Sequence, residues 1–138
     1  MTLEEVQQII DNGPYLSWLG LKVLDLGEDS IEVKATWRPE WVANPKLTQT
    51  HGGILAALID FGADFALVKN IGRPVPTIDM RVDYHRLAKP GNLIVKGKVI
   101  KFGKQFSVSE ARIYDEAGAL IASGRGTYIT APAPEAAK

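Results

Sequence analysis

The sequence predicts an α+β fold in which one long, buried helix packs against a strongly curved antiparallel sheet. Residues 52–69 are apolar nearly all the way round a helix, so this helix must be covered on more than one side. Four segments with strand-like alternation follow it without an intervening helix, which favours antiparallel pairing. A single domain spanning 1–138 accounts for this order of elements.

The segments before the long helix are a short helix, a strand and a loop. The T-x-x-E spacing that begins at Thr2 is that of a capping box, and it predicts a helix to about Asn12 within an N-terminal helical segment of about 1–18. Apolar and polar residues alternate over 30–37, as in a half-buried strand. Residues 38–49 contain two prolines and read as a long loop, and such loops are often functional.

The segments after the long helix are predicted to be strands over 77–84, 93–102, 105–114 and 119–129. In the third of these, the parity of the apolar positions slips between Val108 and Ala111, which predicts a β-bulge there. The Pro/Ala-rich tail over 131–138 is expected to be flexible.

The charge balance argues against partners that need a strong field. The chain has 16 Lys+Arg and 16 Asp+Glu, so its net charge favours neither nucleic acid nor an anionic membrane. It has no cysteine, which excludes a cysteine nucleophile and is typical of a reducing compartment. The polar N-terminus is unlike a signal peptide, and no apolar run reaches membrane-spanning length. We therefore expect a cytoplasmic protein.

The stretch from Thr50 to Asp64 combines two features that suggest chemistry. Gly52 and Gly53 stand at the start of the long helix, where exposed backbone N–H groups and the helix dipole favour negative charge. Asp60 and Asp64 lie one turn apart inside an otherwise apolar helix, where carboxylates are costly to desolvate.

Helix geometry keeps the glycines and the first aspartate apart. Gly52 and Asp60 lie about 12 Å apart along the axis, at about 1.5 Å per residue. A hydrogen bond spans only about 3 Å, so one helix cannot hold a single carbonyl between both groups. If both act on one substrate, Gly52 of one subunit must meet Asp60 of another across a homodimer. A homotetramer built as a dimer of dimers is equally compatible.

At this point the residues resemble a known family. His51-Gly52-Gly53 with an acidic residue nine positions after the histidine, the segment 77–84, and Ala88-Lys89-Pro90-Gly91 are similar to the hotdog-fold acyl-CoA thioesterases. The branch is the one named for phenylacetate degradation, related to the 4-hydroxybenzoyl-CoA thioesterases. The resemblance covers about 19–129. It implies the hotdog fold and hydrolysis of an aryl- or medium-chain acyl-CoA to free acid and CoA.

The resemblance also implies roles for individual residues. Asp60 matches the catalytic carboxylate, which acts as nucleophile or as general base on a water. Gly52 matches the residue whose N–H polarises the thioester carbonyl, and His51 matches the histidine beside it. Thr77 aligns with a hydroxyl that orients water near the carboxylate. The residues expected to bind or orient the substrate are Asn44, Gly53, Asp64, Thr77, Arg86 and Lys89.

Some of these assignments depart from the family pattern or have a simpler explanation. Asn44 stands one residue before the position where the family carries Asn or Gln, which is Pro45 here. Asp64 falls where relatives carry a small residue, so a supporting role suits it better. Arg86 and Lys89 would meet CoA phosphates at the surface, although scattered basic residues are usually only solvated.

Structural roles compete with the catalytic ones. His51 could simply cap the helix, the two glycines could serve helix–strand packing, and Asp60 could be a buried structural acid. Two other functions stay open: a non-catalytic acyl-CoA or aromatic-ligand binding protein, and a hotdog dehydratase. Neither a cofactor nor a metal is expected, because no ligand-like spacing of His, Cys and carboxylates occurs. The acyl group is not determined by the sequence.

Overall fold

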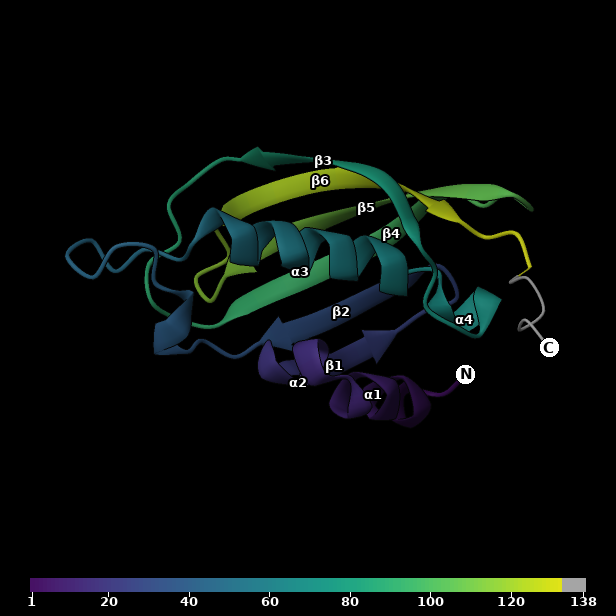
Figure 1. The fold of residues 1–138 in the computed structure, drawn as a ribbon, viewed down its shortest axis with the longest axis horizontal. Coiled ribbons are helices and arrows are strands. Elements are labelled where there is room, and N and C mark those ends of the chain that lie inside the picture. Colours follow the sequence, from purple (N-terminus) through teal and green to yellow (C-terminus); the bar gives the residue numbers. More distant parts are fainter. Residues whose placement is uncertain (133–138) are drawn as a thin grey trace.

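The computed structural model describes residues 1–132, in which a six-stranded antiparallel sheet wraps round one central helix (Figure 1). The strands are β1 (Leu21–Leu26), β2 (Ser30–Ala35), β3 (Thr77–Tyr84), β4 (Leu93–Lys101), β5 (Phe106–Asp115) and β6 (Leu120–Ile129). Their order across the sheet is β1-β2-β4-β5-β6-β3. The helices are α1 (Leu3–Asn12), α2 (Pro14–Trp18), α3 (Gly52–Phe65) and α4 (Val68–Ile71). The predicted α+β arrangement is confirmed.

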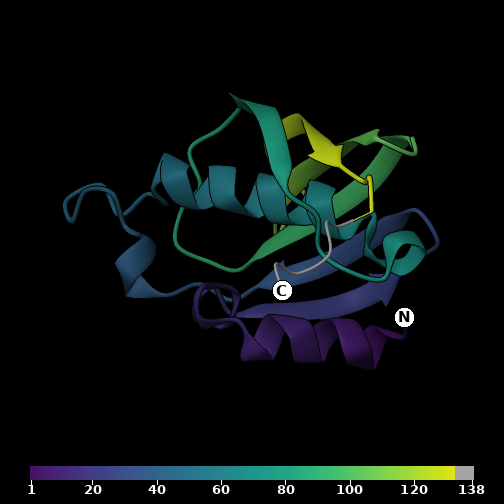
Figure 2. The ribbon, with the colours of Figure 1, turned by 45° about the vertical axis from the view of Figure 1, so that its right-hand side comes forward.

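Helix α3 lies directly on the inner face of the sheet, and two glycines allow this close contact (Figures 1 and 2). A Cβ atom at Gly97 on β4 would overlap the carbonyl oxygen of Gly62 on α3, and a Cβ at Gly62 would lie 2.7 Å from Cγ1 of Val95. Neither position therefore accepts a side chain without a shift of helix against sheet. This contact fixes the depth at which α3, and every functional group on it, sits in the fold.

The two edges of the sheet differ. Along β1, the side-chain amide of Gln7 on α1 replaces a neighbouring strand: its Nε2 donates to the carbonyl oxygen of Leu21 at 3.0 Å, and its Oε1 accepts from the N–H of Val23 at 2.8 Å. The capping box at Thr2 fixes the start of α1, as predicted. β3 forms the other edge and pairs on one side only, with β6. One edge is therefore blocked and the other is open.

Strand β1 was not expected from the sequence, because a bulge interrupts its alternation. The register with β2 shifts between Val23 and Asp25, and the extra residue, Leu24, is 42% exposed. Apolar and polar residues therefore do not alternate regularly along β1.

The long helix is shorter than predicted. It ends at Phe65 instead of continuing to Lys69, because the N–H of Leu67 bonds to the carbonyl of Asp64, three residues back, and tightens the last turn. The apolar pattern continues through the break because Leu67 and Val68 are also buried. The predicted loop over 38–49 contains one short 3₁₀ turn, Pro39–Trp41.

The bulge predicted in the strand over 105–114 is wrong. The inner face of β5 alternates without interruption through Ser107, Ser109, Ala111 and Ile113, all buried, and two of these residues are serines. Phe106 and Val108 simply point to the other face. The irregularity belongs to the neighbouring strand, where β4 shifts register between Val99 and Lys101. Residues 133–138 of the expected flexible tail lie outside the described residues.

Candidate active site

The start of α3 leaves one backbone donor free. His51 is the N-cap, and its Nδ1 accepts the N–H of Gly53 at 2.8 Å. The N–H groups of Ile54 and Leu55 donate to the carbonyl oxygen of His51. Within residues 1–132 the N–H of Gly52 has no such acceptor, so it is the donor that a ligand can use.

The cap also explains the second glycine, Gly53. Because Nδ1 of His51 accepts a hydrogen bond, the proton of the neutral ring is on Nε2. A Cβ at Gly53 would lie 3.0 Å from that Nδ1, so a side chain would crowd the cap. His51 therefore has the capping role that the sequence left open, and the N–H of Gly53 is engaged inside the protein.

Tyr84, which the sequence analysis did not single out, closes the space beside Gly52. Its hydroxyl donates to the carbonyl oxygen of Gly52 at 3.0 Å, and its ring lies 3.5 Å from where a Cβ of Gly52 would be. The N–H of Thr50 donates to the carbonyl of Ala88 at 2.8 Å. The start of α3, the end of β3 and the loop after it therefore meet at one end of the molecule.

Asp60 lies in the middle of α3, and one of its carboxylate oxygens is held twice. Oδ1 accepts the hydroxyl of Thr77 at 2.8 Å and the hydroxyl of Tyr128 at 3.0 Å. No hydrogen bond to Oδ2 is present among the described residues. Asp60 is half-buried and Thr77 is exposed, so the carboxylate remains accessible from outside.

A β-bulge delivers Thr77 to this carboxylate. Thr77 pairs with Tyr128, but Asp79 pairs with Thr127, so Ile78 is an extra residue. Without it, Thr77 would share the face of Asp79 and Arg81, which is the outer face of the sheet. The bulge turns the hydroxyl inward, a re-aiming that is common beside active sites.

Asp64 has a different neighbourhood, one turn further along α3. Its Oδ1 accepts the N–H of Val75 at 2.9 Å and so holds the segment that leads into Thr77. Burial raises the pKa of Asp64 from an ordinary 3.8 to about 7; the bond from Val75 opposes this rise and the charge of Asp60 adds to it. Asp64 is thus placed to support the strand start, and to carry a proton near neutral pH.

The structure does not bring the remaining predicted residues to Asp60. Asn44 closes a local turn, where its Oδ1 accepts the N–H of Lys46 at 3.0 Å. Arg86 and Lys89 line a surface cavity of about 550 Å³ between the loop after β3 and the β5–β6 turn. This cavity lies near the Gly52 end because Ala88, which binds Thr50, belongs to the same loop.

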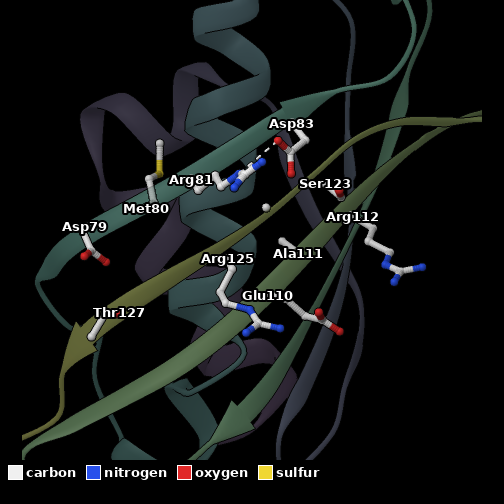
Figure 3. Close-up of a pocket in the computed structure, with 11 residues that line it drawn as sticks. Asp79, Met80, Arg81, Asp83, Glu110, Ala111, Arg112, Ser123, Arg125 and Thr127 are labelled. Atoms are coloured by element: carbon white, nitrogen blue, oxygen red, sulfur yellow. Dashed lines mark hydrogen bonds and ion pairs between the residues drawn. The ribbon is translucent and has the colours of Figure 1, made fainter.

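A second cavity, of about 590 Å³, lies on the outer face of β3, β5 and β6, opposite α3 (Figure 3). Three arginines and three carboxylates line it, and the ion pair between Arg81 Nε and Asp83 Oδ1 measures 3.2 Å. Its charges balance, and neither Gly52 nor Asp60 contributes to it. The candidate site therefore lies on the inner face of the sheet, beside α3, and not in this cavity.

Residues 1–132 contain neither a candidate metal site nor a candidate membrane-spanning helix. No group of three or more His, Cys, Asp and Glu side chains there could hold a metal ion. No helix in the same range is both long and apolar enough to cross a bilayer.

A long central helix inside a curved antiparallel sheet defines the hotdog fold, and here the helix carries a free N–H at its start and an accessible carboxylate in its middle. Residues 49–122 match the thioesterase superfamily. The chain belongs to this superfamily, and thioester hydrolysis is its class of activity.

Individual relatives agree with this assignment. The chain is 46% identical to a thioesterase-superfamily protein of known X-ray structure, with a TM-score of 0.89 over 92% of this chain and 96% of that one. It is 23% identical to the medium/long-chain acyl-CoA thioesterase YigI of Escherichia coli over 84% of each chain. The PaaI protein of the Escherichia coli phenylacetic acid degradation operon shares the fold, with a TM-score of 0.82, 22% identity, and coverage of 91% and 90%.

Proposed function

We propose that the protein hydrolyses aryl- or medium-chain acyl-CoA thioesters at a site shared by two copies of the chain. The observation that carries this proposal is that α3 presents two complementary groups too far apart to act together. The free N–H of Gly52 suits an oxyanion, and the carboxylate of Asp60 suits attack or proton removal. They lie about 12 Å apart along one helix, so each needs its counterpart from another chain.

In the proposed reaction, the thioester carbonyl oxygen accepts the N–H of Gly52, which stabilises the negative charge of the tetrahedral intermediate. Asp60 either attacks the carbonyl carbon, giving an anhydride that water then hydrolyses, or takes a proton from the attacking water. In both routes the carbon–sulfur bond breaks and CoA leaves as the thiolate. The imidazole Nε2–H of His51 is available beside the same carbonyl.

The open edge of the sheet supports the pairing of two chains. β3 offers an unpaired row of backbone groups, and its inner face exposes Met80 and Tyr84, which are 39% and 54% exposed. Because Gln7 blocks the β1 edge, sheet extension through β3 stops at two copies. These edges support a closed two-fold homodimer, and a tetramer would be a dimer of such dimers.

The cavity that holds Arg86 and Lys89 is the proposed contact for CoA phosphates. It adjoins the Gly52 end, where the thioester would lie, and neither cation forms an ion pair in residues 1–132. Asn44 lies in the loop before α3, and the turn that its Oδ1 closes with Lys46 would have to rearrange before Asn44 could contact the substrate. The expected compartment is the cytoplasm.

The first experiment is thiol release from a panel of aryl and alkyl acyl-CoAs, with wild type and Asp60→Asn. We expect hydrolysis by wild type and a loss of at least about 100-fold in kcat for the variant. Ligand binding without thiol release from any member of the panel would favour the non-catalytic binding protein instead.

The shared site has a sharper test, mixing of two inactive variants. Gly52→Pro removes the N–H without breaking the helix: position 52 is the first helical residue, which accepts proline, and His51 has the ψ of 137° that proline requires before it. The pyrrolidine ring also adds carbon atoms beside Tyr84. In a mixed dimer with Asp60→Asn, one site has both groups intact and the other has neither. A 1:1 mixture should regain about a quarter of wild-type activity, since half of its dimers are mixed.

Gly52→Ala, which keeps the N–H, is the matched comparison and should retain far more activity than Gly52→Pro. The Cβ would lie 3.5 Å from the ring of Tyr84, an ordinary contact. If mass spectrometry shows mixed dimers but activity does not return, the site lies within one chain.

A further inference from the structure

Among residues 1–132, Tyr128 on β6 is the one fully buried side chain whose polar group reaches the proposed catalytic carboxylate. It is 0% exposed, and its hydroxyl lies 3.0 Å from Oδ1 of Asp60 and 3.3 Å from the Asp60 carbonyl oxygen. A buried tyrosine hydroxyl needs a partner, and Asp60 provides it. Neither the sequence pattern nor the resemblance pointed to this residue.

The backbone of β6 is shaped for this tyrosine. Gly126, two residues earlier on the same inner face, lies under the ring: a Cβ there would be 2.6 Å from the Tyr128 hydroxyl oxygen and 2.7 Å from a ring carbon. Any side chain at position 126 would displace the ring. The glycine and the tyrosine therefore form one unit that aims a hydroxyl at α3.

We propose that Tyr128 is a positioning residue for Asp60: with Thr77 it holds Oδ1, which leaves Oδ2 as the oxygen that meets the thioester or the water. This inference rests on Asp60 being the reacting carboxylate. Two donors on one oxygen fix both χ angles of the side chain and stabilise its charged form. The second oxygen then faces the substrate without a competing donor from the described residues.

The two donors are not equivalent. The hydroxyl of Thr77 is exposed and stands on the open-edge strand, whereas that of Tyr128 comes from the buried interior. Burial and the negative charges of Asp60 and Asp64 raise the pKa of Tyr128 well above its ordinary value, so the hydroxyl keeps its proton. Tyr128 therefore remains a hydrogen-bond donor across the neutral pH range.

The test is Tyr128→Phe, which removes the hydroxyl and keeps the ring over Gly126. We expect kcat to fall by about 10- to 100-fold with KM changed by less than about two-fold, because the substrate does not touch the tyrosine. The acid limb of the pH profile of kcat/KM should move to higher pH, since the carboxylate loses a donor that favours its charged form.

A readout without turnover accompanies the kinetics. The ¹³Cγ resonance of Asp60, assigned by its loss in Asp60→Asn, should titrate at higher pH in Tyr128→Phe than in wild type. Tyr114→Phe is the matched control: it lies on β5, its ring stacks under Lys96 Nζ at 5.4 Å, and it does not contact Asp60. It should leave kcat, the pH profile and the titration unchanged.

The outcomes separate this inference from the proposed function. If Asp60→Asn is inactive but Tyr128→Phe keeps wild-type kcat and the same Asp60 titration, Tyr128 does not position the carboxylate and only this inference falls. If Asp60→Asn keeps full activity, the proposed function and the inference both fall. A parallel rise in KM with unchanged kcat in Tyr128→Phe would also refute the positioning role, because it would indicate substrate binding.

Discussion

The raised pKa of Asp64 predicts that this carboxyl destabilises the folded protein as the pH rises. The folded group titrates at about 7 and the unfolded group at about 3.8. Between these values the folded state binds more protons than the unfolded state, so the free energy of unfolding falls with rising pH. The penalty is absent below about pH 4 and complete above about pH 7. A rise from 3.8 to about 7 corresponds to about 4 kcal/mol at most.

Asp64→Asn isolates this contribution. The asparagine carbonyl can still accept the N–H of Val75, and it carries no charge at any pH. Residual solvent around the half-buried side chain reduces the penalty, so we expect about 2–4 kcal/mol. The variant should therefore match wild type near pH 4 and exceed it by this amount near pH 8.

Urea unfolding followed by circular dichroism from pH 4 to pH 8, at one fixed protein concentration, measures the difference directly. Asp25→Asn is the matched control, because Asp25 is an exposed aspartate on β1 and its removal should give no such pH-dependent gain. A constant difference between Asp64→Asn and wild type across this range would refute the reasoning. It would mean that Asp64 ionises in the folded protein as it does in the unfolded chain.

Three further predictions concern the site and its support. Thr77→Val should lower kcat by about 10-fold, because Asp60 loses its exposed donor, and Thr77→Ser should restore it in the same thiol-release assay. Gly97→Ala should lower the free energy of unfolding by about 1–3 kcal/mol or more in urea titrations, since the new Cβ overlaps the helix backbone. A stability equal to that of wild type would contradict the close contact between Gly97 on β4 and Gly62 on α3. The double change Arg86→Ala and Lys89→Ala should raise KM for acyl-CoA and make that KM less dependent on salt concentration. KM for an acyl-pantetheine, which lacks the nucleotide phosphates, should not change. Equal effects on both substrates would argue against phosphate binding.

Regular alternation made most of the fold predictable, and interruptions of the pattern caused the errors in the strands. The strands after α3 were placed within a residue or two, because apolar and polar positions alternate over most of their length. β1 was missed because Leu24 interrupts its alternation. The error in β5 has another cause. Ser107 and Ser109 are buried, so the polar residues of this strand do not mark the side that faces solvent.

The candidate site was only partly readable for a related reason. Asp60 stands out because a carboxylate inside an apolar helix is costly, and the glycine pair stands out because it opens that helix. Parity alone would place Thr77 on the outer face, and only the bulge at Ile78 turns it inward. Tyr128 carries no signal at all, since an aromatic residue is ordinary in a strand. Its role depends on a contact between residues 68 positions apart.

The proposed homodimer would explain both the open edge of the sheet and the incomplete site. Among residues 1–132 of a single chain, the β3 edge has no partner strand, the N–H of Gly52 has no acceptor, and Oδ2 of Asp60 has no donor. An unpaired strand edge and polar groups without partners would each be unfavourable if the chain acted alone. In that homodimer, a second copy would extend the sheet through β3, cover the edge and place the two α3 helices against each other. Substrate would then satisfy the two remaining groups, so the proposal makes activity and assembly depend on the same face of the molecule.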